Sequence, residues 1–427
     1  MKTKNRLSLI ITALAFVSCT DDVSDLALVD QLSQENNSRS YSEAFIVAQN
    51  SISLLSSTTT RSGFASREID TTKTRAITRP VTRDGSVEND TIIYVFNFKD
   101  NNGFALVSAS LATEELLAVT EKGNYFPSQP SEIEGFNEFV ELAANYVRTA
   151  SDIGLRKPYP HGPVVYKDSI VVTYEELYPS LYEPPYKPIN WEQEIPEGEF
   201  CDNNLAGCVN TAIGEIMMFF SYPTSIQLTY PNADKSMEIL NWQNVRNHEP
   251  PCFIPFCNDT ATHYSIGRLV RQIGYLTDSD YEDYTKTSKN DIKPALEELG
   301  FSVGNWINYS RLSILSDMCD RHIFMVCGQK NSLEGHAWLL DHMIKKIATT
   351  YELYLTAMGW VPTGVVHTTT SYLLHYNWGS YGSCNGYFNE NVYTMSEEEI
   401  SDNTGGMING PSYNINTQFL SVSVNNY

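Results

Sequence analysis

A cysteine at the start of an apolar helical pattern is the feature that most constrains this chain. Cys208 follows Gly207, and the residues after it place one apolar face on a helix: Ala212, Ile213, Ile216, Met217 and Phe220. The cysteine therefore stands at a helix N-terminus, where the helix macrodipole stabilises a thiolate. A buried structural cysteine or one half of a disulfide would satisfy the same pattern, so this placement alone does not establish a nucleophile.

Two later segments carry side chains that could serve such a nucleophile. Ile323–Gly328 is an apolar strand, and after a loop Gly335–Asp341 begins a second strand that holds His336. Further along, a strand ends in Asn377 and Trp378, which could offer an amide or a carbonyl to orient an imidazole and an indole to cover it. Taken singly, the histidine could be structural and the last segment a hairpin with aromatic cover.

The N-terminal part of the chain predicts a small α+β unit that ends near residue 150. Its patterns predict two helices and three strands, with a hairpin turn between the first two strands. These are the helices Ser42–Leu55 and Phe136–Val147 and the strands Thr91–Phe98, Phe104–Ala109 and Leu116–Thr120. Residues 51–80 are rich in Ser and Thr with scattered Arg and Lys, which predicts an exposed linker.

The rest of the chain divides into a connector and a larger unit. Residues 151–190 are rich in Pro and Tyr and predict an extended connector, and residues 191–427 contain the three segments that carry the chemistry. With residues 1–18 as a signal peptide and 19–150 as the small unit with its linker, we expect four parts in all.

The N-terminal residues predict an export signal. Lys2, Lys4 and Arg6 precede an apolar run from Leu7 to Val17, which is too short to span a bilayer. Cys19 follows closely and resembles the acylated cysteine of bacterial lipoproteins, which predicts a membrane contact through lipidated Cys19. Ordinary cleavage to a soluble secreted protein is the alternative. We expect an outer-membrane or cell-surface lipoprotein, or a protein secreted after processing.

The charge of the chain argues against nucleic acid as a partner. Its 427 residues include 51 acidic residues against 29 Lys and Arg, a formal net charge of −22. Such a field repels phosphate groups. No central apolar run reaches the roughly 18 residues that would suggest a membrane span.

Taken together, the three segments resemble the C10 family of papain-like cysteine peptidases, typified by streptopain. The resemblance rests on the order Cys, His, Asn-Trp and on the motifs Gly207-Cys208-Val209 with Thr211-Ala212, Gly335-His336-Ala337-Trp338 with Asp341, and Asn377-Trp378-Gly379 followed by Asn385-Gly386-Tyr387-Phe388. Trp191-Glu192-Gln193 is similar to the W-x-Q element of the family. Tyr94-Val95-Phe96-Asn97 and the segment Gly103–Ala109 are similar to the hairpin of the family's propeptide.

The resemblance implies an α+β fold, with a papain-like cysteine protease fold preceded by a small α+β propeptide domain. It also implies a zymogen-type cysteine endopeptidase that hydrolyses proteins or peptides and prefers a hydrophobic residue two positions before the cleaved bond. The propeptide domain would pack against the larger unit until the connector is cut. The resemblance implies no cofactor.

The same resemblance implies a role for each site residue. Cys208 would attack the scissile carbonyl, and His336 would accept the thiol proton and later protonate the leaving amine. Gln193 and the backbone N–H of Cys208 would bind the oxyanion. Asn377 or the backbone of Trp378 would orient His336, with the Trp378 indole shielding the pair from water.

The chain departs from the family's pattern at three places. Ser380-Tyr381 stands where a second Trp and a Gly are expected, and His342 rather than Gly follows Asp341. The stretch before Asn377 is also long, with Trp360–Gly364 as an expected insertion. These departures bear on substrate preference more than on catalysis.

The other cysteines and histidines lack a comparable setting. Export permits disulfides among the cysteines other than Cys19 and Cys208, and Cys252 and Cys257 are the local candidates for a pair. The sequence has no C-x-x-C pair and no H-E-x-x-H motif, so we expect no metal site. We expect the remaining histidines of the larger unit's later segments to be structural: His322, His342, His367 and His375.

Two other functions stay open at this stage. A peptidoglycan amidase or transpeptidase can also use a cysteine and a histidine, although a propeptide-like first domain is not part of its usual plan. A non-catalytic surface binding lipoprotein could have kept the scaffold, although every expected catalytic residue type is present.

Overall fold

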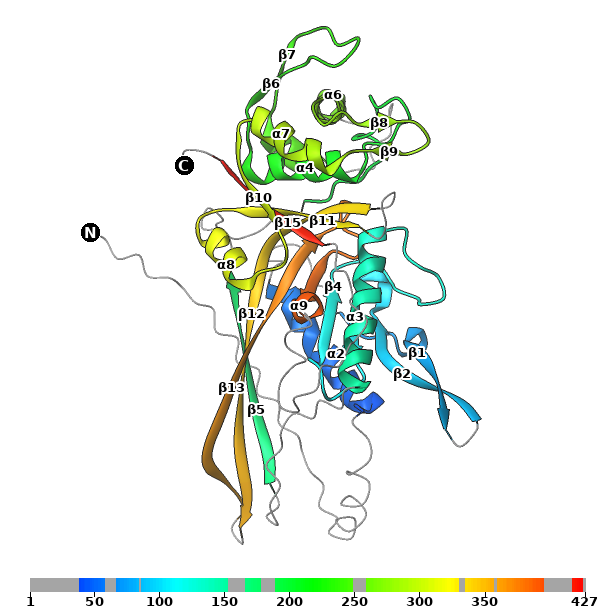
Figure 1. The fold of residues 1–427 in the computed structure, drawn as a ribbon, viewed down its shortest axis with the longest axis vertical. Coiled ribbons are helices and arrows are strands. Elements are labelled where there is room, and N and C mark those ends of the chain that lie inside the picture. Colours follow the sequence, from blue (N-terminus) through cyan, green and yellow to red (C-terminus); the bar gives the residue numbers. More distant parts are fainter. Residues whose placement is uncertain are drawn as a thin grey trace, which may run out of the picture.

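The computed structural model describes residues 38–57, 67–83, 86–152, 166–177, 189–248, 259–329, 335–356, 359–394 and 417–424. Strands from both halves of the chain join in one 11-stranded sheet, and a group of helices lies beyond one end of it (Figure 1). No helix in these ranges is both long and apolar enough to cross a bilayer. The predicted signal peptide, Cys19, Cys252 and Cys257 lie outside the described residues.

The N-terminal unit confirms the predicted helices and strands. It contains the helices α2 (Tyr41–Ser57) and α3 (Glu134–Asp152), the strands β1 (Arg75–Arg83), β2 (Ser86–Asn97), β3 (Phe104–Ser108) and β4 (Leu116–Thr120), and the short 3₁₀ helices η1 (Thr71–Lys73) and η2 (Lys99–Asn101). Side chains of β3 alternate between two hydrophobic clusters: Phe104 and Leu106 join the cluster of α3, and Ala105 and Val107 join that of α2. The two helices therefore cover opposite faces of the sheet.

The predicted linker over residues 51–80 is wrong at both ends. Helix α2 continues to Ser57, and β1 pairs with β2 in antiparallel register from Arg75↔Val95 to Arg83↔Ser86. Strand β1 lies at the edge of the sheet, and its described side chains are half-buried or exposed. An edge strand with one open side tolerates the Arg and Thr residues that made this segment resemble a linker.

The sheet of the N-terminal unit continues into the larger unit. Strand β4 pairs with β14 (Gly386–Asn389), with Val119 opposite Tyr387. From β14 the sheet runs through β13 (Gly359–Asn377), β12 (Gly335–Thr356), β11 (Ile323–Gln329), β15 (Gln418–Val424) and β10 (Phe301–Ile307). The strands predicted at 323–328 and 335–341 are thus confirmed, and main-chain hydrogen bonds join the two units.

Strands β12 and β13 form a long hairpin that runs away from the helical end of the molecule (Figure 1). Strand β5 (Tyr166–Leu177) pairs along β12, from Met343↔Leu177 to Tyr354↔Tyr166. The connector predicted over residues 151–190 therefore contains a paired strand. The prediction missed this strand because its run of β-branched residues, Ile170-Val171-Val172-Thr173, stands among many Pro and Tyr residues. The expected insertion Trp360–Gly364 lies in β13 at the far end of this hairpin.

Helix α4 (Cys208–Phe220) is the centre of the helical group. Every residue from Val209 to Phe220 is buried, because the helix packs against α6 on one side and β12 on another. The remaining helices are α5 (Trp242–Asn247), α6 (Thr260–Leu276), α7 (Lys289–Glu298), α8 (Arg311–Cys319) and α9 (Asn391–Thr394). Two small ribbons complete the unit: β6 (Ser225–Gln227) with β7 (Met237–Ile239), and β8 (Asp280–Tyr281) with β9 (Thr285–Lys286).

Candidate active site

Cys208 is the first residue of α4, as the sequence predicts. Gly207 caps the helix with φ of 84°, a left-handed conformation that favours glycine. A Cβ at this position would also lie 2.6 Å from the Thr285 methyl group. The backbone N–H of Ala337 lies near the Cys208 thiol, close enough to lower its pKa against the effect of burial. Since Ala337 follows His336 directly, strand β12 brings the histidine segment to the cysteine across more than a hundred residues of chain.

His336 is held among aromatic rings. Its Nε2–H donates to the backbone carbonyl of Trp378 over 3.1 Å, which places the proton on Nε2. Its ring lies nearly parallel to that of Trp338, at an interplanar angle of 18°, and the Trp338 and Trp378 ring centroids are 4.9 Å apart. The histidine is buried, with 8% of its surface exposed. The described contacts of Cys208 and His336 include no hydrogen bond between the two side chains.

Burial favours the neutral forms of the Cys208 thiol and the His336 imidazole. Burial raises the pKa of the Cys208 thiol, and the charge of Glu134 raises it further, against the opposing effect of the Ala337 N–H. Burial lowers the pKa of His336, and this outweighs the opposite effects of the Trp378 carbonyl and of Glu134. A neutral thiol beside a neutral imidazole is a poor nucleophile, because the thiolate is the reactive form. Both shifts therefore oppose formation of the thiolate.

The Asn377 side chain hydrogen-bonds to the segment that follows it, to Ile189 and to α4, and not to His336. Its Nδ2 donates to the Ile189 carbonyl over 2.8 Å and to Glu215 Oε1 over 3.0 Å. Its Oδ1 accepts from the Gly379 N–H and from Asn385 Nδ2. Of the two alternatives expected for orienting His336, the structure brings the Trp378 carbonyl to the imidazole and ties the Asn377 amide to α4 instead.

Gln193 lies in a loop fixed to the start of α4. Its carbonyl accepts a hydrogen bond from the Ala206 N–H over 2.7 Å. The Trp191 ring packs on Gly214 of α4, where any Cβ would overlap the indole. The Trp191 carbonyl accepts from the Tyr381 N–H over 2.9 Å, so the loop is also tied to the segment after Trp378. These bonds hold half-buried Gln193 close to the N-terminus of α4.

The N-terminal unit covers the histidine. Gly135, in the first turn of α3, packs so closely that a Cβ there would lie 2.8 Å from His336 Cδ2 and 2.8 Å from the Trp378 ring. One turn later, Glu138 of α3 contacts Gly328 of β11, which is the register partner of His336. Helix α3 thus lies over the end of the sheet that presents the imidazole.

Sequence reasoning missed three residues that bear on this site. Glu215 is fully buried beside Asn377, and burial raises its pKa well above the usual range. Cys327 is the register partner of Ala337, and its pKa is raised by burial and by the nearby Cys208. The sequence does not single out Gly135, because a glycine near the start of a helix can be there for many structural reasons. Only its contact with His336 reveals its role.

One group among the described residues could offer three ligand atoms to a metal ion. Asp341, His342 and His375 place a carboxylate oxygen and two imidazole nitrogens within 4.8 Å of one another, and all three residues are buried. We expected both histidines to be structural and no metal site. The adjacency of His342 and Asp341 in the sequence is the signal that could have drawn attention to this group.

Two family models match parts of this chain. Residues 183–388 match the model of the Peptidase C10 family, and residues 31–147 match the model of the Spi protease inhibitor. Among solved structures, the chain is similar to a mutant fragment of prointerpain A from Prevotella intermedia, at 15% identity, with a TM-score of 0.46, over 82% of this chain and 98% of that one. The search of curated proteins found no match.

The two family matches divide the chain as the structure does. The inhibitor match contains the strands β1 to β4, and the peptidase match contains Gln193, Cys208, His336, Asn377 and Trp378. The α+β fold, with a propeptide domain before the peptidase domain, is confirmed. Residues 183–388 thus match the Peptidase C10 family behind a propeptide inhibitor domain, and the chain is a cysteine peptidase that carries its own propeptide.

Proposed function

We propose that the protein is an endopeptidase whose nucleophile is Cys208 and whose general base is His336. The observation that carries this proposal is that the Ala337 backbone N–H lies near the Cys208 thiol, which brings the residue next to His336 to Cys208. Cys208 also stands at the N-terminus of α4, where the helix dipole favours a thiolate once the site is open to water.

Each of the proposed site residues has one role in this reaction. His336 takes the proton of the Cys208 thiol, and the thiolate sulfur forms a bond to the scissile carbonyl carbon. The Gln193 amide and the Cys208 backbone N–H donate to the resulting oxyanion. His336 then returns its proton to the leaving amine as the peptide bond breaks, and a water molecule hydrolyses the thioester. The Trp378 carbonyl orients the imidazole and the indole keeps water from it.

Latency follows from the position of α3. With Gly135 against His336, the imidazole keeps its Nε2 proton on the Trp378 carbonyl and stays neutral. Release of α3 exposes the imidazole, which removes the burial that lowers its pKa and lets Nδ1 accept the thiol proton while Nε2 stays bonded to the Trp378 carbonyl. We propose that activation cuts the connector outside β5, because the main-chain hydrogen bonds of a paired strand protect it from a protease.

A direct assay tests this function against cell-wall hydrolysis. The activated full chain should release peptides from casein under reducing conditions and leave purified peptidoglycan intact, since residues 183–388 match a peptidase family. Among short peptide substrates, those with a hydrophobic residue two positions before the cleaved bond should have the highest kcat/KM. Hydrolysis of cell wall without hydrolysis of casein would contradict the proposal.

We further propose that the protein is exported and anchored through Cys19. The basic and apolar residues before Cys19 support this, because they match the start of a lipoprotein signal. The Cys19→Ser variant should lose incorporation of a labelled fatty acid and move from the membrane fraction to the soluble fraction, since acyl chains supply the anchoring energy. Equal membrane retention of both proteins would contradict lipid anchoring. The membrane is then a partner, beside protein substrates and the propeptide domain.

A further inference from the structure

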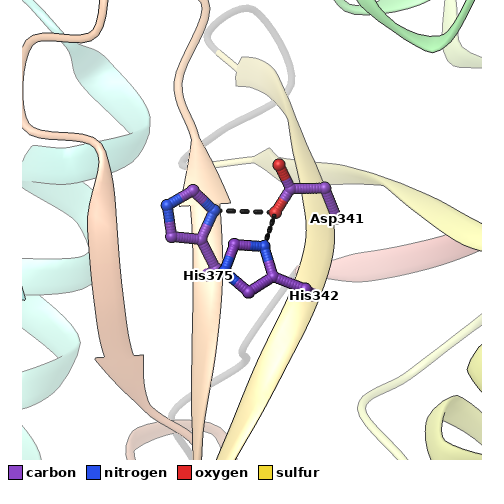
Figure 2. Close-up of side chains that lie close together, drawn as sticks. All are labelled: Asp341, His342 and His375. Atoms are coloured by element: carbon purple, nitrogen blue, oxygen red, sulfur yellow. Dashed lines mark hydrogen bonds and ion pairs between the residues drawn. The ribbon is translucent and has the colours of Figure 1, made fainter. Parts of the chain in front are cut away.

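A buried cluster of charged and polar side chains lies where the propeptide sheet joins the peptidase sheet. Figure 2 shows Asp341 and His342 on β12 and His375 on β13, with both imidazoles bonded to one carboxylate oxygen. Asp341 Oδ1 accepts from His342 Nδ1 over 2.8 Å and from His375 Nδ1 over 2.7 Å. The two rings stack with centroids 4.1 Å apart, and each of the three residues is at most 2% exposed.

The second nitrogen of each imidazole faces a further group. His342 Nε2 lies 3.0 Å from the Tyr387 hydroxyl on β14. His375 Nε2 lies 3.6 Å from Oε1 of Glu121, which follows β4 in the propeptide domain. The Glu121 backbone N–H donates to the Asn385 carbonyl over 2.8 Å, so the main chain holds this residue against the peptidase domain. His375 therefore lies between a carboxylate of its own domain and one of the propeptide.

This geometry favours a positively charged His375. An imidazole between two carboxylates satisfies both only as imidazolium, with a proton on each nitrogen. Burial lowers the pKa of His375, but Asp341 and Glu121 raise it more strongly, to about 10. Burial lowers the pKa of His342, which favours its neutral form. For Glu121, the contact with His375 outweighs burial and lowers the pKa.

We infer that the peptidase domain has a carboxylate-binding site at His375, supported by Asp341, and that Glu121 of the propeptide occupies it in the zymogen. The inference deepens the proposed latency and rests on it. The contact adds a charged attachment at the β4–β14 junction, separate from the packing of α3 on His336. A partner that binds here has to present a carboxylate at the end of a strand paired with β14.

The pH dependence of this attachment follows from the groups around it. His375 faces Asp341 and His342 on β12, Tyr387 on β14 and Glu121 from the propeptide. Two outer groups act on the cluster: Arg67, whose Nη2 donates to the Glu121 carbonyl, and Glu215, which interacts with Asp341. The Glu121 contribution is present above its ordinary pKa of 4.5 and is lost in acid, because its pKa is depressed in the zymogen.

The His375 contribution has the opposite sign. It is complete below the ordinary pKa of 6.5 and is lost as pH rises toward 10, because the pKa of His375 is raised in the zymogen. Because Asp341 stays on His375 when the propeptide leaves, the attachment is strongest from about pH 4.5 to at least 6.5, and it weakens in acid and as the pH approaches 10.

The variant Glu121→Gln tests this inference in the full-length zymogen. Glutamine keeps the size of the side chain and removes its charge. An epoxide thiol inhibitor should label Cys208 of the variant about tenfold faster than the wild type at pH 6, because the propeptide opens more often. The variant-to-wild-type ratio at each pH cancels the reactivity of the thiol itself. We expect this ratio to fall toward one as the pH rises from 6.5 toward 10.

Glu68→Gln is the matched control, because Glu68 forms an exposed ion pair with Lys99 within the propeptide domain. The inhibitor should label Cys208 of this control variant at the wild-type rate. After cleavage and removal of the propeptide, all three proteins should label and hydrolyse casein equally. Equal labelling of the two zymogens at every pH would overturn the inference. A second result would also overturn the inference: if each wild-type chain binds one metal ion, and if removal of this ion by a chelator accelerates the labelling of Cys208. Failure of the activated proteins to label at Cys208 would instead contradict the proposed function.

Discussion

Replacement of Cys208 by alanine will abolish casein hydrolysis by the activated protein, with a loss of kcat on the order of 10⁴-fold or more. Alanine removes the only atom that bonds to the substrate carbonyl in the proposed reaction. Because Cys208 is the first residue of α4 and only partly buried, the loss of one sulfur atom should leave the fold intact. Activity on casein under reducing conditions measures the effect, and circular dichroism checks the fold.

Cys327→Ala is the matched control for this experiment. Cys327 lies on β11 opposite Ala337, near Cys208, and burial raises its pKa strongly. Its replacement removes the same atom from the same domain, and it should leave kcat within a few-fold of the wild type. If the Cys327 variant is as inactive as the Cys208 variant, or if both remain active, Cys208 is not the nucleophile.

Gly135→Val should convert the zymogen into a partly active protein before any cleavage. A Cβ at this position would lie 2.8 Å from both His336 and the Trp378 ring, so valine cannot fit while α3 is docked. Forced packing of this kind costs about 1–3 kcal/mol, and here the cost falls only on the docked state. The epoxide inhibitor should therefore label Cys208 of the intact zymogen about 5-fold to 150-fold faster than in the wild type.

Glu141→Val provides the comparison for Gly135→Val. Glu141 is an exposed residue of the same helix, and its replacement introduces the same side chain without a new contact to the peptidase domain. The inhibitor should label Cys208 of the intact Glu141→Val zymogen at the wild-type rate. Unchanged labelling of the Gly135 variant would mean that α3 does not control access to the cysteine, and the proposed latency would be wrong.

The α+β fold and the order of the site elements were predictable from the sequence because local patterns encode them. The helix that starts at Cys208, the strands that hold His336 and precede Asn377, and the propeptide hairpin each have the periodicity of their structure. The Ser/Thr-rich linker and the connector were wrong where β1 and β5 form. These two strands depend on pairing with β2 and β12, and pairing between distant segments leaves little trace in local composition.

The sequence by itself determined which side chains are available for chemistry and on which elements they stand. Only the tertiary structure decided how they are used: that the Trp378 carbonyl rather than the Asn377 amide meets His336, that Gly135 blocks the imidazole, and that Glu121 reaches His375. Each of these contacts joins residues far apart in the chain. Their pKa values and hydrogen bonds depend on burial and on charges a few ångströms away, which exist only once the sheet has brought both domains together.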